Sequence, residues 1–336
     1  MKRPSIALAM QPSRTEHVLP AATLRRLSEI ADLLDPDPLQ RFDDDRARRI
    51  LAETDILITG WGSPYVGREV RVAAPRLRLI AHAAGTVKGI VDEQIFDAGI
   101  AVTHAAEANS VPVAEFTLAA IIFAGKQVFR FRDRYVTDRD RDRTHSMQRL
   151  AIGNYRRTVG IIGASRIGRR VIALLRPFEY QVLLFDPTLN ADEARSLGTE
   201  KVDLASLMTR SDIVSLHAPS LPSTRHMIGA EELSLMKDGA TLINTARGAL
   251  IDEAALLKTL ATGRIDAIID VTDPEIPEKT SAFYDLPNVF LTPHIAGAVG
   301  LERGRLGDMA VDEIERFMKG EPLLYQILRR DLALIA

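Results

Sequence analysis

The sequence predicts an α/β protein with two doubly wound parallel-sheet domains. Short β-rich runs alternate with helical patterns along most of the chain, which is typical of βαβ units and parallel sheets. At 336 residues the chain is too long for one comfortable hydrophobic core. A composition of 46% hydrophobic and 26% charged residues is ordinary for a soluble globular enzyme.

Composition also excludes several classes of function. A formal net charge of −2 draws the chain neither to nucleic acid nor to an anionic membrane, and the apolar run "SIALAM" is too short for a signal peptide or a membrane span. The sequence contains no cysteine, which excludes disulfides, thiolate nucleophiles and cysteine-ligated metal sites. We expect a cytoplasmic protein with no nucleic-acid, membrane or metal partner.

Local patterns define each element of the first third. The expected strands are Ser5–Met10, Asp55–Trp61, Leu77–His82 and Ile100–His104, and the expected helices are Ala21–Leu34, Asp44–Leu51 and Asp92–Ala98. A longer helix is expected to begin with Asn109 or Ser110 as its N-cap, to carry Pro112 in its first turn, and to run to about Val128.

A run of alternating arginine and aspartate, "FRFRDRYVTDRDRDRTHSMQ", follows that helix. Its charges nearly cancel, so a nucleic-acid patch is not expected. Two interpretations stay open: a solvated surface segment that pairs its own charges, or an arm that contacts a second subunit. A second βαβ series then runs from Thr158 to about Leu291, and a final helix is expected over Leu301–Gly320.

The first unit of that second series, "TVGIIGASRIGRRVIALL", is typical of a dinucleotide-binding loop. Gly163, Ser165 and Gly168 occupy the places of three glycines between a strand and a helix, whose N-terminus favours a pyrophosphate. The next strand ends in Asp186, placed to accept hydrogen bonds from ribose hydroxyls, although it could also form a turn ahead of Pro187. Asp186 would repel a 2′-phosphate, so NAD is expected rather than NADP. Because the Ser165 hydroxyl can donate to a phosphate oxygen, we expect serine in place of the middle glycine to change the affinity for the dinucleotide only slightly.

Three polar residues lie at or just after strand ends of this second series. Arg247 is expected to end the strand in "LINTARG", Glu275 to follow the strand end in "DVTDPE", and His294 to end the strand in "LTPHIAG". The carboxyl ends of parallel strands meet at one edge of a sheet, where ligands bind. Singly, the three could be a structural ion pair, a solvated loop acid and a turn histidine. Together they indicate a catalytic site.

With these motifs the sequence resembles the D-isomer-specific 2-hydroxyacid dehydrogenase family from about Asp55 to Gly320. The resemblance rests on "VGIIGASRIG", "LHAPSLPSTRHMI", "INTARG", "DVTDPE" and "TPHIAG". It implies a Rossmann-type NAD-binding domain over 109–297 and a discontinuous, flavodoxin-like substrate-binding domain over 1–108 and 298–336, with the cofactor between them. It also implies a homodimer formed through the NAD-binding domain.

The resemblance further implies that Arg247, Glu275 and His294 are the catalytic trio. The residues expected to bind NAD are Gly163, Ser165, Arg166, Ile167, Gly168, Asp186, Pro219, Thr224, Thr245, Ala246, Arg247, Asp270 and His294. The residues expected to bind substrate are Trp61, Ala84, Gly85, Thr86, Arg247 and His294. Asp270 would meet the nicotinamide carboxamide, and His217 would line the adenosine side without a chemical role.

The expected reaction is hydride transfer between NAD(H) and C2 of a small 2-hydroxy or 2-keto acid of D configuration, as in a glyoxylate or hydroxypyruvate reductase. Arg247 would hold the substrate carboxylate and polarise the C2 oxygen. His294 would be the general acid and base at that oxygen. Glu275 would hold the other ring nitrogen and favour the protonated imidazole near neutral pH.

The expected substrate loop, "AAGTVKGIVD" over Ala83–Asp92, departs from the family pattern at its usual Asp-Asn pair. Lys88 could meet an anionic substituent or be a solvated lysine, and Trp61 could wall the pocket or pack in the core. His82 and His104 are interpreted as structural. The substituent on the acid stays open.

Two rival functions use the same fold. A non-enzymatic NAD(H)-sensing regulator, such as a transcriptional co-repressor, can keep the same trio, but a chain that ends compactly at Ala336 favours the enzyme. A formate dehydrogenase would be expected to have glutamine in place of Glu275.

Overall fold

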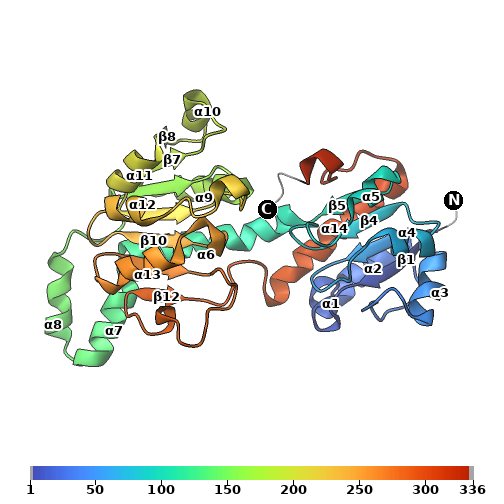
Figure 1. The fold of residues 1–336 in the computed structure, drawn as a ribbon, viewed down its shortest axis with the longest axis horizontal. Coiled ribbons are helices and arrows are strands. Elements are labelled where there is room, and N and C mark those ends of the chain that lie inside the picture. Colours follow the sequence, from blue (N-terminus) through green and yellow to red (C-terminus); the bar gives the residue numbers. More distant parts are fainter. Residues whose placement is uncertain (1–2, 333–336) are drawn as a thin grey trace. The chain divides into compact units, whose positions relative to one another are not determined.

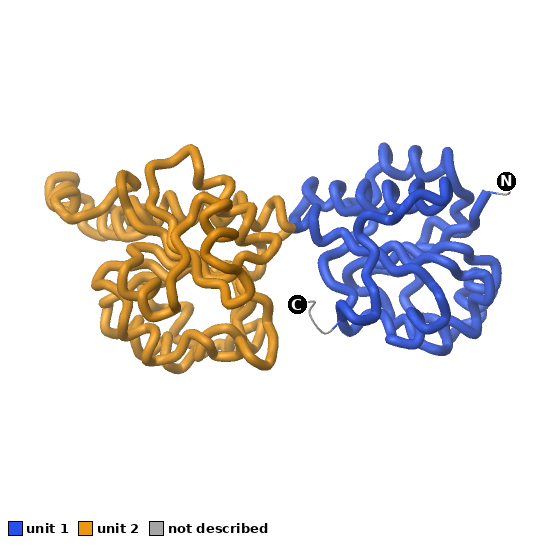
Figure 2. The backbone as a smooth tube through the Cα atoms, turned by 90° about the horizontal axis from the view of Figure 1, so that it is seen from above, with its two compact units in different colours: residues 1–109, 298–336 blue, residues 110–297 orange. Residues whose placement is uncertain are grey.

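The computed structural model describes residues 3–332 and divides the chain into two compact units (Figure 2). Unit 1 comprises residues 1–109 and 298–336, and unit 2 comprises residues 110–297. The chain passes from unit 1 to unit 2 after Asn109 and returns to unit 1 after Gly297.

Unit 1 is built on a five-stranded parallel sheet with the order β2-β1-β3-β4-β5 (Figure 1). Its strands are β1 Ser5–Ala9, β2 Asp32–Leu33, β3 Ile56–Thr59, β4 Leu79–His82 and β5 Ala101–His104. This is the flavodoxin-like order 2-1-3-4-5. Alternate residues of a strand face opposite sides of the sheet. Ala7 and Leu57 accordingly lie in one hydrophobic cluster, whereas Ile6 and Ile56 lie in another.

Helices cover both faces of the unit 1 sheet. They are α1 Pro12–Val18, α2 Ala21–Ile30, α3 Asp45–Glu53, α4 Arg68–Ala73, α5 Glu93–Asp97 and α14 Gly304–Lys319. The predicted helix Ala21–Leu34 is too long, because α2 ends at Ile30 and Asp32–Leu33 pair with β1 as an edge strand. Helices α1 and α4 were not predicted, since seven and six residues are too few to establish a helical period.

Unit 2 is built on a seven-stranded parallel sheet with the order β12-β11-β10-β9-β6-β7-β8. Its strands are β6 Thr158–Ile162, β7 Gln181–Phe185, β8 Glu200–Lys201, β9 Ile213–Leu216, β10 Thr241–Asn244, β11 Asp266–Ile269 and β12 Val289–Leu291. The chain starts at β6, builds outward to β8, and returns to β9 on the other side. This is the Rossmann order with a seventh strand, so the predicted fold class is confirmed.

The unit 2 sheet is also covered on both faces. Its helices are α7 Val128–Asp138, α8 Arg141–His145, α9 Arg166–Leu175, α10 Ala191–Ser196, α11 Leu204–Arg210, α12 Ala230–Leu235 and α13 Glu253–Ala261. Short 3₁₀ turns are η1 Ser146–Arg149, η2 Pro222–Thr224, η3 Gly248–Leu250 and η4 Ala282–Tyr284, with η5 Gly300–Arg303 and η6 Arg329–Asp331 in unit 1. Helix α9 follows the residues that the sequence predicts for it.

Helix α6, Ala106–Gly125, runs from unit 1 into unit 2. It begins before the predicted N-cap at Asn109 or Ser110, so Pro112 lies inside the helix rather than in its first turn. By length and composition α6 could cross a membrane, the one such helix in the described residues. Side chains such as Ala114 and Ile121 are instead buried in the core of unit 2, which identifies it as a core helix.

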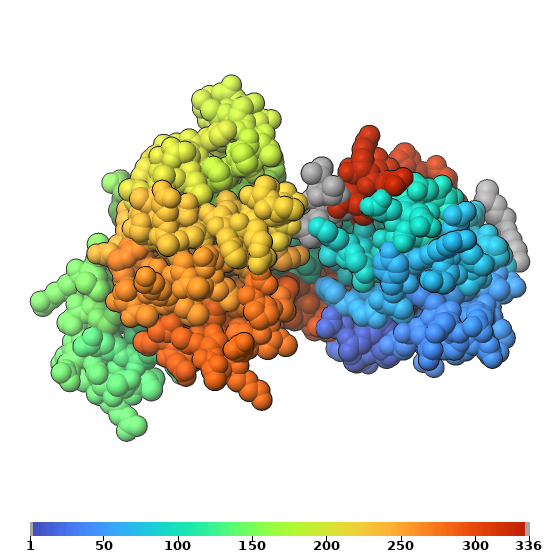
Figure 3. Space-filling model, in the orientation of Figure 1, coloured from blue at the N-terminus to red at the C-terminus, as the bar shows by residue number. Residues whose placement is uncertain are grey.

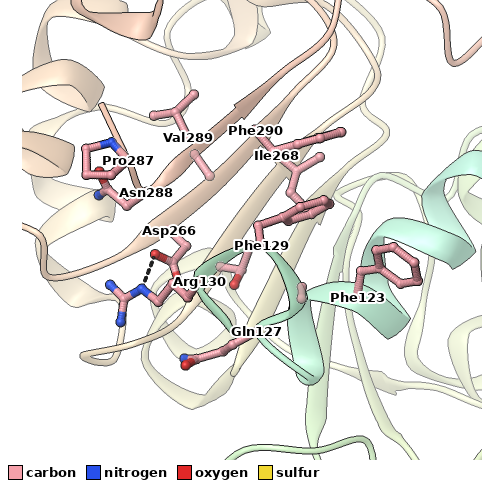
Figure 4. Close-up of a pocket in the computed structure, with 13 residues that line it drawn as sticks. Phe123, Gln127, Phe129, Arg130, Asp266, Ile268, Pro287, Asn288, Val289 and Phe290 are labelled. Atoms are coloured by element: carbon pink, nitrogen blue, oxygen red, sulfur yellow. Dashed lines mark ion pairs between the residues drawn. The ribbon is translucent and has the colours of Figure 1, made fainter. Parts of the chain in front are cut away.

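The arginine and aspartate run forms α7, α8 and η1, which stand out from the body of unit 2 (Figures 1 and 3). Its charges pair within the segment in part, as Arg134 and Asp138 do at 3.1 Å. The start of α7 is anchored to the sheet, because Phe129 stacks on Phe290 with ring centroids 4.0 Å apart (Figure 4). The interpretation as a solvated segment that pairs its own charges therefore applies only to the outer part of this run.

Candidate active site

The loop between β6 and α9 has the backbone of a dinucleotide-binding turn. Gly163 has a φ of 96°, and a Cβ on it would lie 2.6 Å from the backbone nitrogen of Ala218. A Cβ on Gly168 would lie 2.1 Å from the carbonyl oxygen of Gly163. Glycine at 168 therefore lets α9 pack closely on the end of β6, and glycine at 163 lets the turn pass close to the loop after β9. Arg166 and Ile167 form the first turn of α9.

Ser165, the departure from three glycines, is the N-cap of α9. Its Oγ accepts a hydrogen bond from the backbone N–H of Gly168 at 3.3 Å, and its own backbone is extended. This capping role was not anticipated from the sequence. The hydroxyl still has its proton to donate, so the predicted contact with a phosphate oxygen stays a prediction.

Asp186 follows β7 and joins it to the turn between β6 and α9. Its Oδ2 accepts from the backbone N–H of Ala164 at 2.7 Å, and its Oδ1 accepts from the N–H and hydroxyl of Thr188 at 2.8 and 2.6 Å. Burial alone would raise the pKa of the Asp186 carboxyl, but these hydrogen bonds outweigh burial and lower the pKa. The carboxylate is therefore charged and fixed in place.

A cavity of about 550 Å³ opens beside Asp186. Its lining residues are Phe185, Asp186, Pro187, Ala191, Lys201, Val202, Asp203 and Ser206. A cavity of this size with a fixed carboxylate at its edge fits one nucleoside half of a dinucleotide.

The loops after β9 and β10 carry further residues that the sequence assigns to the cofactor. The Thr224 hydroxyl donates to the carbonyl oxygen of Pro219 at 2.6 Å, which closes the loop after β9. Thr245 is buried, and its Oγ1 lies 2.9 Å from Oγ1 of Thr117 on α6. The first hydrogen bond closes the loop after β9 on itself, and the second joins the loop after β10 to α6.

Arg247 lies three residues beyond the end of β10, not at the strand end that the sequence predicts. Asn244, the last residue of β10, holds the turn, because its amide donates to the Arg247 carbonyl at 2.9 Å and its Oδ1 accepts from the Ala246 N–H at 3.0 Å. Burial lowers the pKa of Arg247, and the negative charge of Glu275 raises it. Arg247 is thus a half-buried cation with Glu275 within electrostatic reach.

The glycine after Arg247 brings this loop against the next one. A Cβ on Gly248 would lie 2.0 Å from the carbonyl carbon of Thr272. Thr272 in turn fixes the acid-bearing turn, since its hydroxyl donates to the carbonyl oxygens of Pro274 at 2.8 Å and Glu275 at 3.1 Å. Glycine at position 248 therefore lets the loop that carries Arg247 pack against the loop that carries Glu275.

His294 and Glu275 are in direct contact through Nδ1 of the histidine and Oε1 of the glutamate. His294 lies three residues beyond β12 with a φ of 53°, in the left-handed region that side chains rarely adopt. About half of each side chain is exposed in unit 2, so Nε2 of the histidine remains available to a ligand. The strained backbone is typical of a functional position.

Asp270 organises the loop that carries His294. Its carboxylate is buried and accepts from the Thr292 hydroxyl at 2.6 Å and from the N–H groups of Ile295 and Ala296 at 2.8 and 2.9 Å. The N–H of His294 donates to the Asp270 carbonyl at 2.8 Å. The predicted contact of Asp270 with a carboxamide stays a prediction, but its role in shaping the loop is clear from these bonds.

Four of the expected substrate residues belong to unit 1, whereas the trio belongs to unit 2. Trp61 follows β3 and is half-buried, and it packs against two core clusters of that unit. Ala84 is buried, and Gly85 and Thr86 are half-buried in the loop after β4. The Thr86 hydroxyl accepts from the N–H of Lys88 at 3.2 Å.

Two histidines at strand ends are buried and neutral. In unit 1, Nδ1 of His82 lies 2.9 Å from the Thr59 hydroxyl, and burial lowers the pKa of His82 to about 4. In unit 2, Nε2 of His217 lies 2.9 Å from the Ser215 hydroxyl, and burial lowers the pKa of His217 to about 3. Both positions agree with a structural role rather than proton transfer.

The residues that sequence reasoning missed all support the predicted ones. They are Asn244, which holds the Arg247 turn, and three threonines, Thr188, Thr272 and Thr292, which hold Asp186, Glu275 and Asp270. The available signal was a hydroxyl or amide side chain within three residues of a strand end. Such side chains commonly bond to nearby backbone, so the signal does not identify a partner.

Comparison with known proteins places this site in a family. Residues 118–296 match the NAD binding domain of D-isomer specific 2-hydroxyacid dehydrogenases. The chain is 34% identical over 303 residues to a glyoxylate reductase of Korarchaeum cryptofilum, which covers 88% of this chain and 90% of that protein. It is 33% identical over 273 residues to a D-3-phosphoglycerate dehydrogenase of Methanocaldococcus jannaschii, covering 81% of this chain and 51% of that one. The chain therefore spans about half the length of that relative.

A solved structure has a similar fold. An acyclic imino acid reductase in complex with NADPH and D-Arg superposes with a TM-score of 0.74 at 27% identity, over 96% of this chain and 100% of that one. The strand order of unit 2, the glycine turn after β6 and the sequence identity to the relatives point to the same family. The chain belongs to the D-isomer-specific 2-hydroxyacid dehydrogenase family.

Proposed function

We propose that the protein is an NAD-dependent reductase of small 2-keto acids, related in activity to glyoxylate and hydroxypyruvate reductases and forming D-2-hydroxy acids. The contact between His294 and Glu275, with Arg247 on the adjoining loop, is the observation that carries this proposal. The similarity to glyoxylate reductases supports the substrate class. A cytoplasmic location is part of the proposal, and cell fractionation tests it.

The residues of the site divide the work by their chemistry. Arg247, whose charge faces Glu275, binds the substrate carboxylate through its planar fork and polarises the C2 oxygen. His294 keeps Nδ1 on Glu275 and so presents Nε2, which donates a proton to the C2 oxygen in reduction and accepts it in oxidation. Bound nicotinamide would supply or accept the hydride.

Replacing the proposed acid–base residue tests this assignment. His294→Ala should lower kcat for 2-keto acid reduction by about 10²–10⁴-fold while NADH still binds. The measurement is NADH oxidation at 340 nm beside a fluorescence titration of NADH. His145→Ala, an exposed histidine of α8, is the matched control. Full activity in the His294 variant would overturn the assignment.

The alternative of a non-enzymatic NAD(H) sensor makes a different prediction for the unmodified protein. Neither the family match nor the relatives favour it, because those relatives are named reductases and dehydrogenases. A panel of 2-keto acids with NADH decides between the two. Turnover of any of them excludes a pure sensor, whereas NADH binding without turnover across the panel favours one.

We also propose that the cofactor is NAD rather than NADP. The support is the Asp186 carboxylate, which Ala164 and Thr188 fix in its charged form beside the nucleoside-sized cavity, where it would repel a 2′-phosphate. The imino acid reductase was solved with NADPH, so the preference has to be measured on this chain. A higher kcat/KM with NADPH than with NADH would contradict this proposal.

A homodimer through unit 2 is the proposed assembly. Large apolar side chains are exposed along the end of α6 and through the following segment, namely Phe123, Tyr135, Val136, Leu150 and Tyr155. Exposed apolar groups of this size commonly mark a protein interface. Light scattering should give a dimer for the unmodified protein and a monomer for Tyr135→Asp combined with Val136→Asp. A monomer without substitutions would exclude this assembly.

A further inference from the structure

The turn of unit 2 that carries Glu275 is held by a second glutamate, Glu253. Oε1 of Glu253 accepts a hydrogen bond from the backbone N–H of Asp273 at 2.6 Å. Asp273 lies two residues before Glu275, in the loop after β11. A short bond between an N–H and a carboxylate is charge-assisted, which makes it stronger than a bond between neutral groups. Glu253 therefore restrains the backbone close to the acid of the trio.

Glu253 itself projects from a well-anchored point of unit 2. It is the first residue of α13, and the preceding Asp252 is the N-cap, whose Oδ1 accepts from the Ala255 N–H at 3.1 Å. The Asp252 N–H donates to the carbonyl oxygen of Ile228 at 2.9 Å, and Ile228 pairs with Ile251 in a parallel bridge. Both isoleucines are buried. A carboxylate on a helix start that is fixed in this way can hold a loop in one position.

The segment 247–253 links Arg247 to the acid-bearing turn through one peptide group. A Cβ on Gly248 would lie 2.0 Å from the carbonyl carbon of Thr272 and 2.5 Å from the nitrogen of Asp273. The N–H on that same nitrogen donates to Glu253. The segment therefore sets the spacing between the arginine of the trio and the turn that carries its acid.

Two other side chains hold the same turn, but neither ties it firmly to the rest of unit 2. The Thr272 hydroxyl bonds to two carbonyl oxygens of the turn itself. Arg225, in the loop after β9, forms an ion pair with Asp273 at 3.1 Å, and 57% and 38% of the two side chains are exposed. An ion pair between exposed groups holds its partners only weakly. Glu253 is thus the stronger link between the turn and another element.

The carboxylate of Glu253 is costly to keep charged where it lies. Glu253 is half-buried, and burial raises the pKa of its carboxyl. The N–H of Asp273 lowers this pKa, the charge of Asp273 raises it and the charge of His226 lowers it, and the result is a pKa above the ordinary value. A partly buried carboxylate beside another carboxylate is not a stabilising arrangement by itself. A role in positioning explains why a charged acceptor stands at this point.

We propose that Glu253 is a positioning residue, whose bond to the Asp273 N–H keeps the carboxylate of Glu275 on Nδ1 of the catalytic histidine. This inference rests on the proposed function, in which His294 is the general acid and base. The hydrogen bond at one ring nitrogen decides which nitrogen of a neutral imidazole carries the proton. With Glu275 in place the proton lies on Nδ1, and Nε2 is left for the substrate. Glu253 thus acts through Glu275 and touches no reacting atom.

Kinetics of Glu253 variants test this directly. Glu253→Ala should lower kcat for 2-keto acid reduction by about tenfold, with less than about a twofold change in KM and in the NADH Kd. Glu253→Gln keeps an oxygen that accepts from the Asp273 N–H, so its kcat should stay within about threefold of that of the unmodified protein. In a Glu275→Ala background, Glu253→Ala should lower kcat by less than about twofold further, because no carboxylate is left to position.

Glu232→Ala is the matched control. Glu232 is a half-buried acid of α12 in the same unit, and its Oε2 accepts from the Gly229 N–H at 2.9 Å. Its removal therefore takes the same kind of bond, from a carboxylate to a backbone N–H, out of unit 2. Glu232→Ala should lower the midpoint of thermal unfolding about as much as Glu253→Ala does, and it should leave kcat unchanged.

The ¹⁵N NMR spectrum of the His294 ring tests the inference without turnover. Above about pH 8, where histidine rings are ordinarily neutral, the shifts of Nδ1 and Nε2 show which nitrogen carries the proton, and His294→Ala identifies the signals. We expect the proton on Nδ1 in the unmodified protein, in Glu253→Gln and in Glu232→Ala. In Glu253→Ala and Glu275→Ala it should move toward Nε2.

Three results would overturn the inference. They are a kcat of Glu253→Ala equal to that of Glu232→Ala, a full additional loss of kcat in the Glu275→Ala background, and an unchanged ring tautomer in Glu253→Ala. If no 2-keto acid is reduced, the proposed function fails separately, and the spectrum of the His294 ring still decides whether Glu253 positions the acid. If Glu253→Ala does not fold, Glu253→Asp replaces it in every comparison, because its carboxylate is one methylene too short to keep the bond to Asp273.

Discussion

The two sheets of this protein end in edges of different character. At the carboxyl edge of unit 2, loops are packed so closely that a Cβ on Gly248 would lie 2.0 Å from the Thr272 carbonyl carbon. At the same edge of unit 1, a Cβ on Gly85 would meet its nearest neighbour, the Asn109 amide, at an ordinary 3.8 Å. The close packing holds acid, base and arginine in fixed geometry, which proton transfer requires. Packing at the unit 1 edge differs between loops, because the loop after β4 has room at Gly85, whereas a Cβ on Gly62, after β3, would lie 2.9 Å from the Gln11 Cβ.

Replacing Gly248 or Gly85 by alanine should show the largest difference in stability between the two sheet edges. Gly248→Ala should lower the free energy of unfolding of unit 2 by about 3 kcal/mol or more, because the Thr272–Asp273 backbone would have to move. Gly85→Ala should change stability by less than about 0.5 kcal/mol. Urea denaturation followed by circular dichroism measures both. Equal midpoints for the two variants would remove the contrast in packing.

The charge of Glu275 should matter to turnover more than to folding. Glu275→Gln keeps the size of the side chain that contacts Nδ1 of His294 but removes its charge, so kcat should fall by about a hundredfold with little change in NADH affinity. Steady-state kinetics and a cofactor titration give the two quantities. Glu278→Gln, an exposed acid in the same loop, is the control. Equal kcat values for the two variants would show that the charge of Glu275 does not contribute to the reaction.

Buried histidines should make both units sensitive to acid, with His82 responsible in unit 1. Its pKa is lowered from 6.5 to about 4 in the folded protein. Below pH 6.5 the unfolded chain therefore binds a proton that the folded chain does not, and stability falls as pH decreases toward 4. The loss between pH 7 and pH 5 is about 2 kcal/mol.

Trp61 fluorescence during urea unfolding reports on this effect in unit 1. His82→Gln should flatten the dependence on pH between 7 and 5, because glutamine does not titrate there. His217 acts in the same direction in unit 2, so it stays unchanged in this comparison. An unaltered pH dependence in the His82 variant would show that other groups cause the loss.

The smallest expected effect concerns the cap of α9. Ser165→Ala should cost about 1 kcal/mol of stability in unit 2, and Ser165→Gly only a few tenths, because glycine is a tolerated N-cap. Ser165→Gly should change the NADH Kd by less than about fivefold. Calorimetric titration measures the Kd. A collapse of NADH binding in the glycine variant would mean that the hydroxyl is a major phosphate ligand.

Local signals explain why some elements were predictable. The unit from β6 to α9 follows the sequence closely, since its apolar strand, glycine turn and helical period all lie within one short segment. Strand ends were less predictable. The strands β10 and β12 end three residues before Arg247 and His294, because side-chain hydrogen bonds from Asn244 and to Asp270 take over from the ladder there. Helix α6 begins earlier than predicted because Pro112 is accommodated inside it.

The sequence by itself determined the two parallel sheets, the glycine turn and the three residues after β10, β11 and β12, because hydrophobic periodicity and turn chemistry are local properties. Only the tertiary structure decided which groups meet. It placed Arg14 and Arg303, from opposite ends of the chain, on one indole ring, and it made Ser165 a helix cap. Contacts of a few ångströms between distant segments depend on the path of the whole chain, which no local pattern specifies.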